Sequence, residues 1–169
     1  MKDHLSPSEA RKVLWEKIKD VRPGMLTTVE QDGSMRSRPM WTLGDEFDGN
    51  LWFFTADDAP KVDELERNPQ VCISYAAPDK DLFLSVSGSA ELVRDKAKAK
   101  EFWNPYAEAW FPEGLDDPNL ALLRVEVAQA EYWEDNKPKV IQFVQALLTA
   151  VTGKQPDWGE NKTIDFSDK

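Results

Sequence analysis

The sequence is poor in the residues that build disulfides, metal centres and catalytic triads. Its 169 residues include one cysteine, Cys72, and one histidine, His4. A lone cysteine cannot form an intramolecular disulfide, so we expect a reducing, cytoplasmic environment and treat Cys72 as a small buried residue. The two residues are too few for a metal site of histidine and cysteine ligands, and we predict none. His4 also stands in a terminus expected to be mobile, which argues against a Ser-His-Asp triad.

Long apolar runs and basic segments are also missing. No apolar run approaches the ~20 residues that a membrane-spanning helix needs, and the polar first residues do not resemble a signal peptide. The formal net charge is −10, with 31 acidic and 21 basic residues. A surface of this charge repels nucleic-acid backbones and anionic membranes, so neither is an expected partner.

What the sequence does contain is typical of a globular protein with a substantial core. Hydrophobic residues make up 41% of the chain and aromatic residues 11%, with seven tryptophans. A chain of this length is expected to form one domain. We assign residues 1–152 to that domain and residues 153–169 to a polar, loosely ordered tail.

Alternating apolar residues predict a mainly β protein. The predicted strands are 25–30, 34–43, 51–55, 70–77, 82–94 and 120–133, with 51–55 expected to be buried on both faces. Helices are predicted to start at Pro7, Pro60, Asp95 and about Lys139, whereas 106–119 is expected to be packed but irregular. Short connections favour an antiparallel sheet, and six strands with flanking helices suit a closed or split barrel.

Local signals mark the turns and caps of this arrangement. Ser6 and Glu9 form a capping box ahead of the first helix, and Asp57 or Asp58 is expected to cap the second. Asp32-Gly33 predicts a hairpin between the first two strands. Gly88 predicts a bulge or bend in the fifth strand.

Three cations gather in the stretch from Gly33 to Lys61. Arg36 and Arg38 alternate on one face of a predicted strand, and Lys61 stands at the start of a helix. An acidic chain that concentrates cations locally indicates a bound anion, and the neighbouring aromatic strand suits a phosphate joined to an aromatic ring. The alternative is an edge strand with a solvated basic face and an ordinary surface lysine. Pro39 marks a sheet edge, a bulge or a ligand position.

The order of these motifs resembles a known family. The segments RSRPMW, LWFFT, PKVDELERNPQVCISYA and FLSVSGSAELV are similar to the FMN-binding split β-barrel superfamily typified by pyridoxamine 5′-phosphate oxidase. The later segment FWNPYAEAWFPEGLDDPNLALLRVEVAQAEYW resembles the general stress protein 26 branch of that superfamily. The resemblance covers about residues 14–133 and implies a six-stranded antiparallel split barrel.

The resemblance also implies a homodimer with FMN in clefts at the subunit interface. It gives the phosphate to Arg38 and Lys61, with Arg36 as a second arginine, and the edge of the flavin ring to the backbone of Pro39 and Met40. The aromatic–threonine pair and the tryptophans expected near the flavin are Phe54, Thr55, Trp103, Trp110 and Trp133. For the three tryptophans, ordinary packing in a core or an interface is the alternative.

Two departures from the family pattern qualify this reading. Ala59 replaces a serine that often precedes the phosphate-binding lysine, which removes one hydroxyl donor. After Trp133 the sequence EDNKPKVIQF lacks the arginine and histidine of the oxidases, so pyridoxamine phosphate oxidation is not expected. The resemblance therefore implies an FMN-dependent oxidoreductase acting on an unknown small molecule. The alternatives are a non-catalytic flavin-binding or sensing protein, and the same barrel with another cofactor such as F420.

Overall fold

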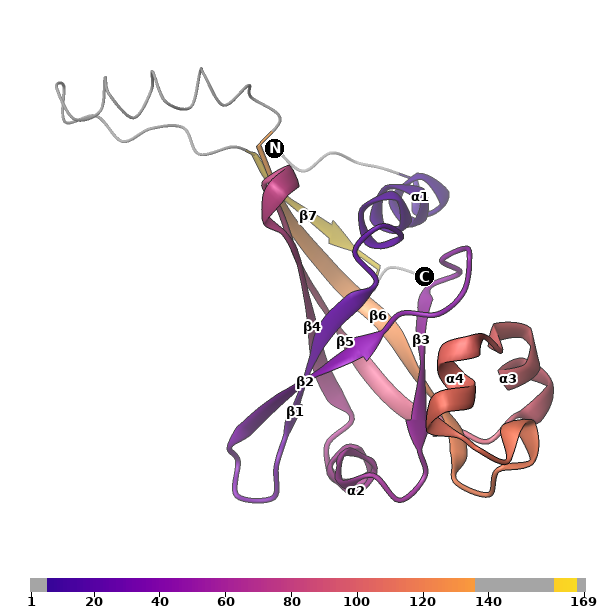
Figure 1. The fold of residues 1–169 in the computed structure, drawn as a ribbon. Helices are drawn as coiled ribbons and strands as arrows, with labels where there is room; N and C mark the ends of the chain where they lie inside the picture. The colour runs from indigo at the N-terminus through magenta and orange to yellow at the C-terminus, as the bar shows by residue number, and fades with distance from the viewer. Residues whose placement is uncertain (1–5, 136–159, 167–169) are drawn as a thin grey trace, which may run out of the picture.

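The strands build one antiparallel sheet whose spatial order differs from their order in the chain. The computed structural model describes residues 6–135 and 160–166. Within them the sheet order is β2-β1-β4-β5-β6-β3, and β7 also pairs with β6 (Figure 1). The strands are β1 (Pro23–Val29), β2 (Met35–Trp41), β3 (Asn50–Ala56), β4 (Gln70–Ala77), β5 (Leu82–Val93), β6 (Leu120–Glu134) and β7 (Glu160–Asp165). The helices are α1 (Pro7–Ile18), α2 (Pro60–Arg67), α3 (Lys96–Phe102) and α4 (Pro105–Trp110), with 3-10 turns η1 (Pro78–Lys80) and η2 (Gly114–Asp116).

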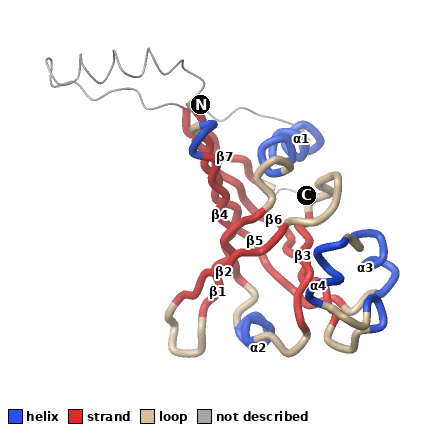
Figure 2. Tube along the Cα trace, viewed as in Figure 1, coloured by secondary structure: helices blue, strands red, loops and turns tan. Residues whose placement is uncertain are grey.

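The sheet curls until its two end strands, β2 and β3, approach each other. The backbone N–H of Leu43, two residues after β2, donates to the carbonyl of Trp52 in β3 at 2.9 Å. Figure 2 shows α3 and α4 together beside β3, and α2 near the end of the sheet that carries the β1–β2 hairpin. The predicted fold, a six-stranded antiparallel split barrel with flanking helices, is confirmed.

The concave face of the sheet and one face of α1 form the main core. Leu14 and Ile18 of α1 are fully buried, as are Leu26 of β1 and Ile73 of β4. The first turn of α1 carries the predicted capping box, in which Ser6 and Glu9 bond to each other's backbone N–H groups. Burial of this apolar face, at about 25 cal/mol per Å², holds the helix on the barrel.

Two glycines shape the sheet where the sequence predicts a turn and a bulge. Gly33 adopts φ +84° in the β1–β2 hairpin, a conformation that favours glycine. At Gly88 the β5–β6 register shifts, and an added Cβ would lie 2.1 Å from the carbonyl oxygen of Glu126. Glycine at position 88 therefore lets the bulged strands β5 and β6 approach closely.

A second, smaller core lies on the other face of β3. Leu43, Ala99 and Leu122 are buried there, with half-buried apolar side chains packed around them. The partly buried members are Trp52, Phe54, Val93, Phe102, Leu115 and Leu120. Strand β3 is thus fully buried on its inner face and half-buried on its outer face. The prediction of burial on both faces is therefore right for the inner face and only partly right for the outer face.

Several local predictions were wrong or lie outside the described residues. Helix α2 begins at Pro60, so its N-cap is Ala59 with no side-chain hydrogen bond; neither Asp57 nor Asp58 caps it, and Asp57 pairs with Arg94. The segment 106–119 is not wholly irregular, since it contains most of α4 and the turn η2. Residues 160–165 of the predicted loose tail form β7, whose Ile164 is buried. The helix predicted from about Lys139 lies outside the described residues.

Candidate functional site

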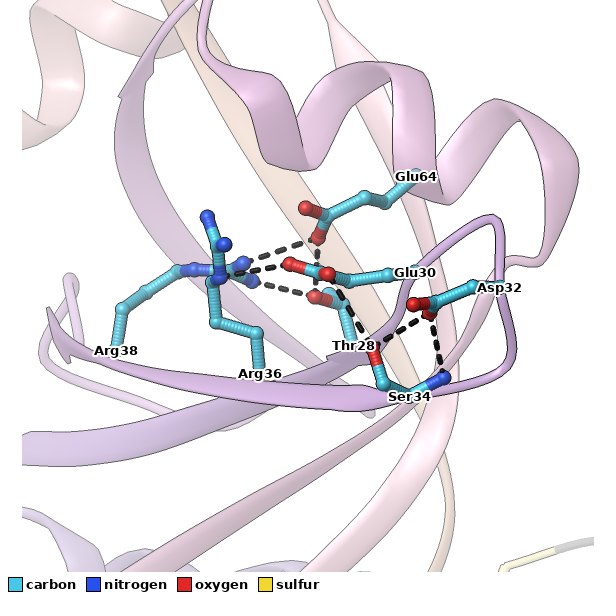
Figure 3. A network of polar contacts seen from close by, with 7 residues as sticks. All are labelled: Thr28, Glu30, Asp32, Ser34, Arg36, Arg38 and Glu64. Atoms are coloured by element: carbon cyan, nitrogen blue, oxygen red, sulfur yellow. Dashed lines mark hydrogen bonds and ion pairs between the residues drawn. The ribbon is translucent and has the colours of Figure 1, made fainter.

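Arg38 is held on two sides by side chains that come from two other elements. Its Nη1 donates to the hydroxyl of Thr28 in β1 at 2.5 Å, and its Nη2 donates to Oε2 of Glu64 in α2 at 3.0 Å. The Thr28 hydroxyl in turn donates to the same Glu64 oxygen (Figure 3). The Arg38 guanidinium, although it comes from an edge strand, is therefore held against both β1 and α2.

Glu64 is the buried acid of this arrangement. It is one of three buried residues of α2, with Val62 and Leu65, and its side chain is only 8% exposed. Burial raises the pKa of Glu64, but the hydrogen bonds from Thr28 and Arg38 outweigh burial, and the net pKa is lowered. The carboxylate stays charged because these partners replace the water that it lost.

Arg36 belongs to a second, more exposed part of the same network. Its Nε lies 2.7 Å from Oε1 of Glu30, and its side chain is 57% exposed. The Ser34 hydroxyl bonds to Glu30 at 3.2 Å and to Asp32 at 2.6 Å, which ties the pair to the hairpin turn. Arg36 also contributes to lowering the pKa of Glu64, so both arginines act on one carboxylate.

Lys61 differs from the two arginines because none of the described carboxylates pairs with it. It occupies the first turn of α2, is half-buried, and makes no ion pair within 4.0 Å among the described residues. Burial lowers the pKa of Lys61, the charge of Arg38 lowers it further, and Glu64 acts in the opposite direction. The ammonium is therefore held near a second cation at an energetic cost that an anion would relieve.

Residues predicted along the ring of a cofactor follow Arg38 on β2. Pro39 is exposed and pairs with Met25 of β1, and its place on an edge strand confirms one of the options predicted for it. Met40 is buried in the main core. A ligand lying along this edge would therefore meet the backbone of Met40 and the exposed face of Pro39.

The predicted aromatic–threonine pair lies at the end of β3. Thr55 is buried, and its hydroxyl donates to the carbonyl of Ala56 at 3.3 Å. The Phe54 ring packs edge-on against Trp103, with 5.9 Å between ring centroids, and against Phe111 at 6.3 Å. Trp103 thus contributes to packing against β3.

The other two tryptophans are both exposed. Trp110 is 79% exposed on α4. Trp133 is 39% exposed and pairs across β6–β5 with Phe83, which in turn pairs with Ala76. That row is at the far end of β4 from Gln70, where α2 leads into the strand. The structure therefore gathers Arg36, Arg38 and Lys61, whereas Trp133 lies toward the opposite end of the sheet from α2.

Thr28 and Glu64 are the site residues that sequence reasoning missed. A carboxylate three residues after Lys61 looks like one member of a charged helix surface, and Thr28 looks like an ordinary strand residue. Helix periodicity gave no signal for Glu64, because a residue two positions after Val62 is turned to another side of the helix. Only in the folded structure is this charge buried, and there Arg38 is its partner.

A separate hollow of about 310 Å³ is unsuited to a phosphate. It is lined by the following residues of the β2–β3 connection, β3 and α3: Gly44, Asp45, Glu46, Asp48, Trp52, Lys98, Glu101 and Phe102. Four carboxylates against one ammonium would repel an anion.

Among residues 6–135 and 160–166, no three histidine, cysteine or acidic side chains converge on a possible metal position. In the same residues, no helix combines the length and apolar character needed to span a bilayer.

Comparison with known proteins identifies related chains. Residues 9–157 match the family model described as pyridoxamine 5′-phosphate oxidase like. Protein bli-3 of Neurospora crassa is 29% identical over 139 residues, covering 77% of this chain and 66% of that protein, so this chain spans just under two thirds of that relative's length. General stress protein 26 of Bacillus subtilis is 31% identical over 118 residues, covering 66% of this chain and 81% of that protein.

A solved structure extends the likeness from sequence to fold. The general stress FMN/FAD binding protein of Xanthomonas citri is 34% identical to this chain. The superposition covers 78% of this chain and 92% of that one, with a TM-score of 0.66. The resemblance deduced from the sequence motifs is therefore confirmed at the level of family and fold.

Proposed function

This chain belongs to the pyridoxamine 5′-phosphate oxidase-like family and is a homologue of general stress protein 26, and from that premise we propose that it binds FMN through Arg38 and Lys61. A flavin would supply hydride and single-electron transfer at its ring. The side chains of this protein would hold the phosphate.

The observation that carries this proposal is the unneutralised cation beside Arg38. Both arginines have carboxylate partners, whereas Lys61 has none among the described residues and is half-buried. Its pKa is lowered by burial and then by Arg38, which means that the site in its present form disfavours its own charge. A phosphate group would reverse that penalty by neutralising both cations.

The donor set fits a phosphate monoester. A guanidinium has five N–H groups, and Thr28 and Glu64 engage one each in Arg38. The remaining N–H groups, the Lys61 ammonium and the uncapped first turn of α2 offer several donors within one region. Ala59 makes no side-chain cap, so no side chain of the described residues caps the first N–H groups of α2, but Ala59 also lacks the hydroxyl donor that a serine would add.

The finer proposal is an FMN-dependent oxidoreductase with a small-molecule substrate. The two carboxylates of the site, Glu30 and Glu64, are both committed to arginines, so proton transfer by a side chain is not the evident task of this site. This favours chemistry that the bound flavin carries out itself. Oxidation of NADH or NADPH by the FMN-loaded protein tests this proposal, and a loaded protein without turnover would instead be a non-catalytic flavin-binding protein.

A homodimer is proposed on the exposed apolar residues of the sheet. On the convex face, Met25, Met35 and Trp41 of β1 and β2 and Phe83 and Trp133 of β5 and β6 are all exposed. The strands between them present small residues there, including Ser74 and Ser85, which pair across β4–β5. Large apolar side chains in contact with water commonly mark an interface. The family resemblance likewise implies a homodimer.

Phe83→Asp is the variant that tests the dimer. It is expected to shift the protein to monomer in sedimentation velocity, while Ala97→Asp, an exposed residue on α3 away from this face, serves as the control for added charge. A Phe83→Asp protein that sediments as wild type would remove this face from the interface.

The flavin proposal is tested by titrating the stripped protein with FMN and with riboflavin, which lacks the phosphate. We expect saturable binding of about one FMN per chain, with riboflavin weaker. Arg38→Ala and Lys61→Ala are each expected to weaken FMN by roughly 1.5–3 kcal/mol, the scale of one charge-assisted bond, with little change for riboflavin. Lys100→Ala, an exposed lysine on α3, is the matched control. Equal losses for both flavins would reject the phosphate site, and absorption of the protein as purified would report any other bound cofactor, such as F420.

A further inference from the structure

Resting on the proposed FMN site, we propose that Glu64 is a positioning residue that holds Arg38 ready for the cofactor's phosphate. Glu64 does not belong to the cation set that defines the site, and its charge opposes an incoming anion. Its effect on affinity must therefore come from what it does to Arg38. The proposal predicts that removing Glu64 weakens FMN although the removal also takes away a negative charge.

The geometry supports a fixed guanidinium. Arg38 comes from an edge strand, where a long side chain facing water would sample many rotamers. Here its side chain is only 18% exposed, and Thr28 and Glu64 hold two different nitrogens of the guanidinium. Two anchors on separate nitrogens restrict both the position and the rotation of the planar group. A preorganised donor binds its ligand more tightly because less conformational freedom is lost on binding.

Glu64, which holds Arg38, lies on the same helix as Lys61, the second cation of the site. Glu64 follows Lys61 by three residues, and side chains at that spacing are neighbours on a helix surface. The charges of Arg38 and Glu64 both act on the Lys61 ammonium. Because Glu64 binds Arg38 and shares a helix with Lys61, it sets the position of Arg38 relative to Lys61. Arg38 and Lys61 are the two cations assigned to the phosphate.

One detail of the contacts separates a positioning role from a purely electrostatic one. The hydrogen bonds from Thr28 and from Arg38 both end on one oxygen, Oε2 of Glu64. Glutamine carries one acceptor oxygen and can place it there, so Glu64→Gln can keep both hydrogen bonds without the negative charge. Glu64→Ala loses the charge and both bonds.

The experiment compares FMN and riboflavin dissociation constants for wild type, Glu64→Ala and Glu64→Gln. We expect Glu64→Ala to raise the FMN constant about tenfold or more and to leave the riboflavin constant within about twofold of wild type. Glu64→Gln is expected to keep FMN binding within about threefold of wild type. Glu66→Ala, an exposed acid on the same helix, should change neither constant.

If the alanine variant fails to fold, Thr28→Val removes the other holder of Arg38 and carries the same expectation. A Glu64→Ala protein that binds FMN as tightly as wild type, or more tightly, would overturn the proposal and leave Glu64 as a competing charge. Equal losses for both flavins would also overturn it, since they would indicate a general structural defect. Wild type that binds neither flavin, or that binds both equally, would instead refute the FMN-phosphate site on which the proposal rests.

Discussion

Replacement of Gly88 by alanine tests how closely β5 and β6 approach each other. The added Cβ would lie 2.1 Å from the Glu126 carbonyl oxygen, 3.0 Å from the carbonyl carbon and 3.1 Å from Cα of Val127. All three atoms are backbone, so no side-chain rotation relieves the clash. The two strands would have to separate where their register shifts, and the hydrogen bonds on either side would lengthen.

The magnitude follows from the cost of overpacking. An extra methyl in a well-packed interior costs about 1–3 kcal/mol when neighbours can shift, and a backbone neighbour shifts least. We therefore expect Gly88→Ala to lower the free energy of unfolding by about 3 kcal/mol or more. For a chain of this size that corresponds to a fall in Tm of roughly 6–12 °C.

The assay is urea and thermal unfolding followed by far-ultraviolet circular dichroism, at one protein concentration because dimer formation would shift the apparent stability. Ser87→Ala, the exposed neighbour in the same strand, is the control and should stay within about 0.5 kcal/mol of wild type. Gly88→Ala with the stability of that control would refute the close approach of β5 and β6.

Three further substitutions probe other parts of the molecule. Thr42→Val should lower the free energy of unfolding by about 1–3 kcal/mol, because the Thr42 and Tyr75 hydroxyls form a hydrogen bond of 2.7 Å in the core and the variant leaves the Tyr75 hydroxyl without it. An unchanged urea midpoint would contradict this. Ile164→Ala should lower the free energy of unfolding by roughly 2–5 kcal/mol in the same assay, because Ile164 of β7 is buried against the barrel. An effect under 0.5 kcal/mol would show that β7 does not pack there. The pKa of Glu64 is lowered below its ordinary 4.5, so its ionised form stabilises the fold above that pH and loses this contribution as the pH falls through the folded-state pKa. The stability difference between wild type and Glu64→Gln should therefore be largest near pH 7 and shrink below about pH 4.5, and a difference that does not vary with pH would contradict the assignment.

Features encoded by neighbouring residues were predictable from the sequence. The capping box of Ser6 and Glu9 and the hairpin at Asp32-Gly33 each depend on residues within a single turn, and both are present. The bulge at Gly88 was also indicated locally, although the strand that requires it, β6, comes more than thirty residues later. The barrel was indicated both by the count of six strands with short connections and by the family resemblance.

Features that depend on contacts between distant segments were not predictable in the same way. Glu64 is a surface acid by helix periodicity alone, and only the approach of β1 and β2 to α2 makes it the partner of Thr28 and Arg38. Strand β7 carries a single apolar residue, Ile164, so its own sequence signals no strand. Its pairing with β6 supplies the backbone hydrogen bonds that define it.

Strand β6 has consequences for the order in which the protein assembles during synthesis. One edge of it is shared by two partners, since residues 120–126 pair with β3 and residues 129–134 pair with β7. β3 is made about seventy residues before β6, whereas β7 leaves the ribosome some twenty-five residues after it. At translation rates of about 5–20 residues per second, half of that edge stays unpaired for roughly one to five seconds. During this interval the nascent chain presents an open strand edge that other chains can join, and pairing by β7 closes it.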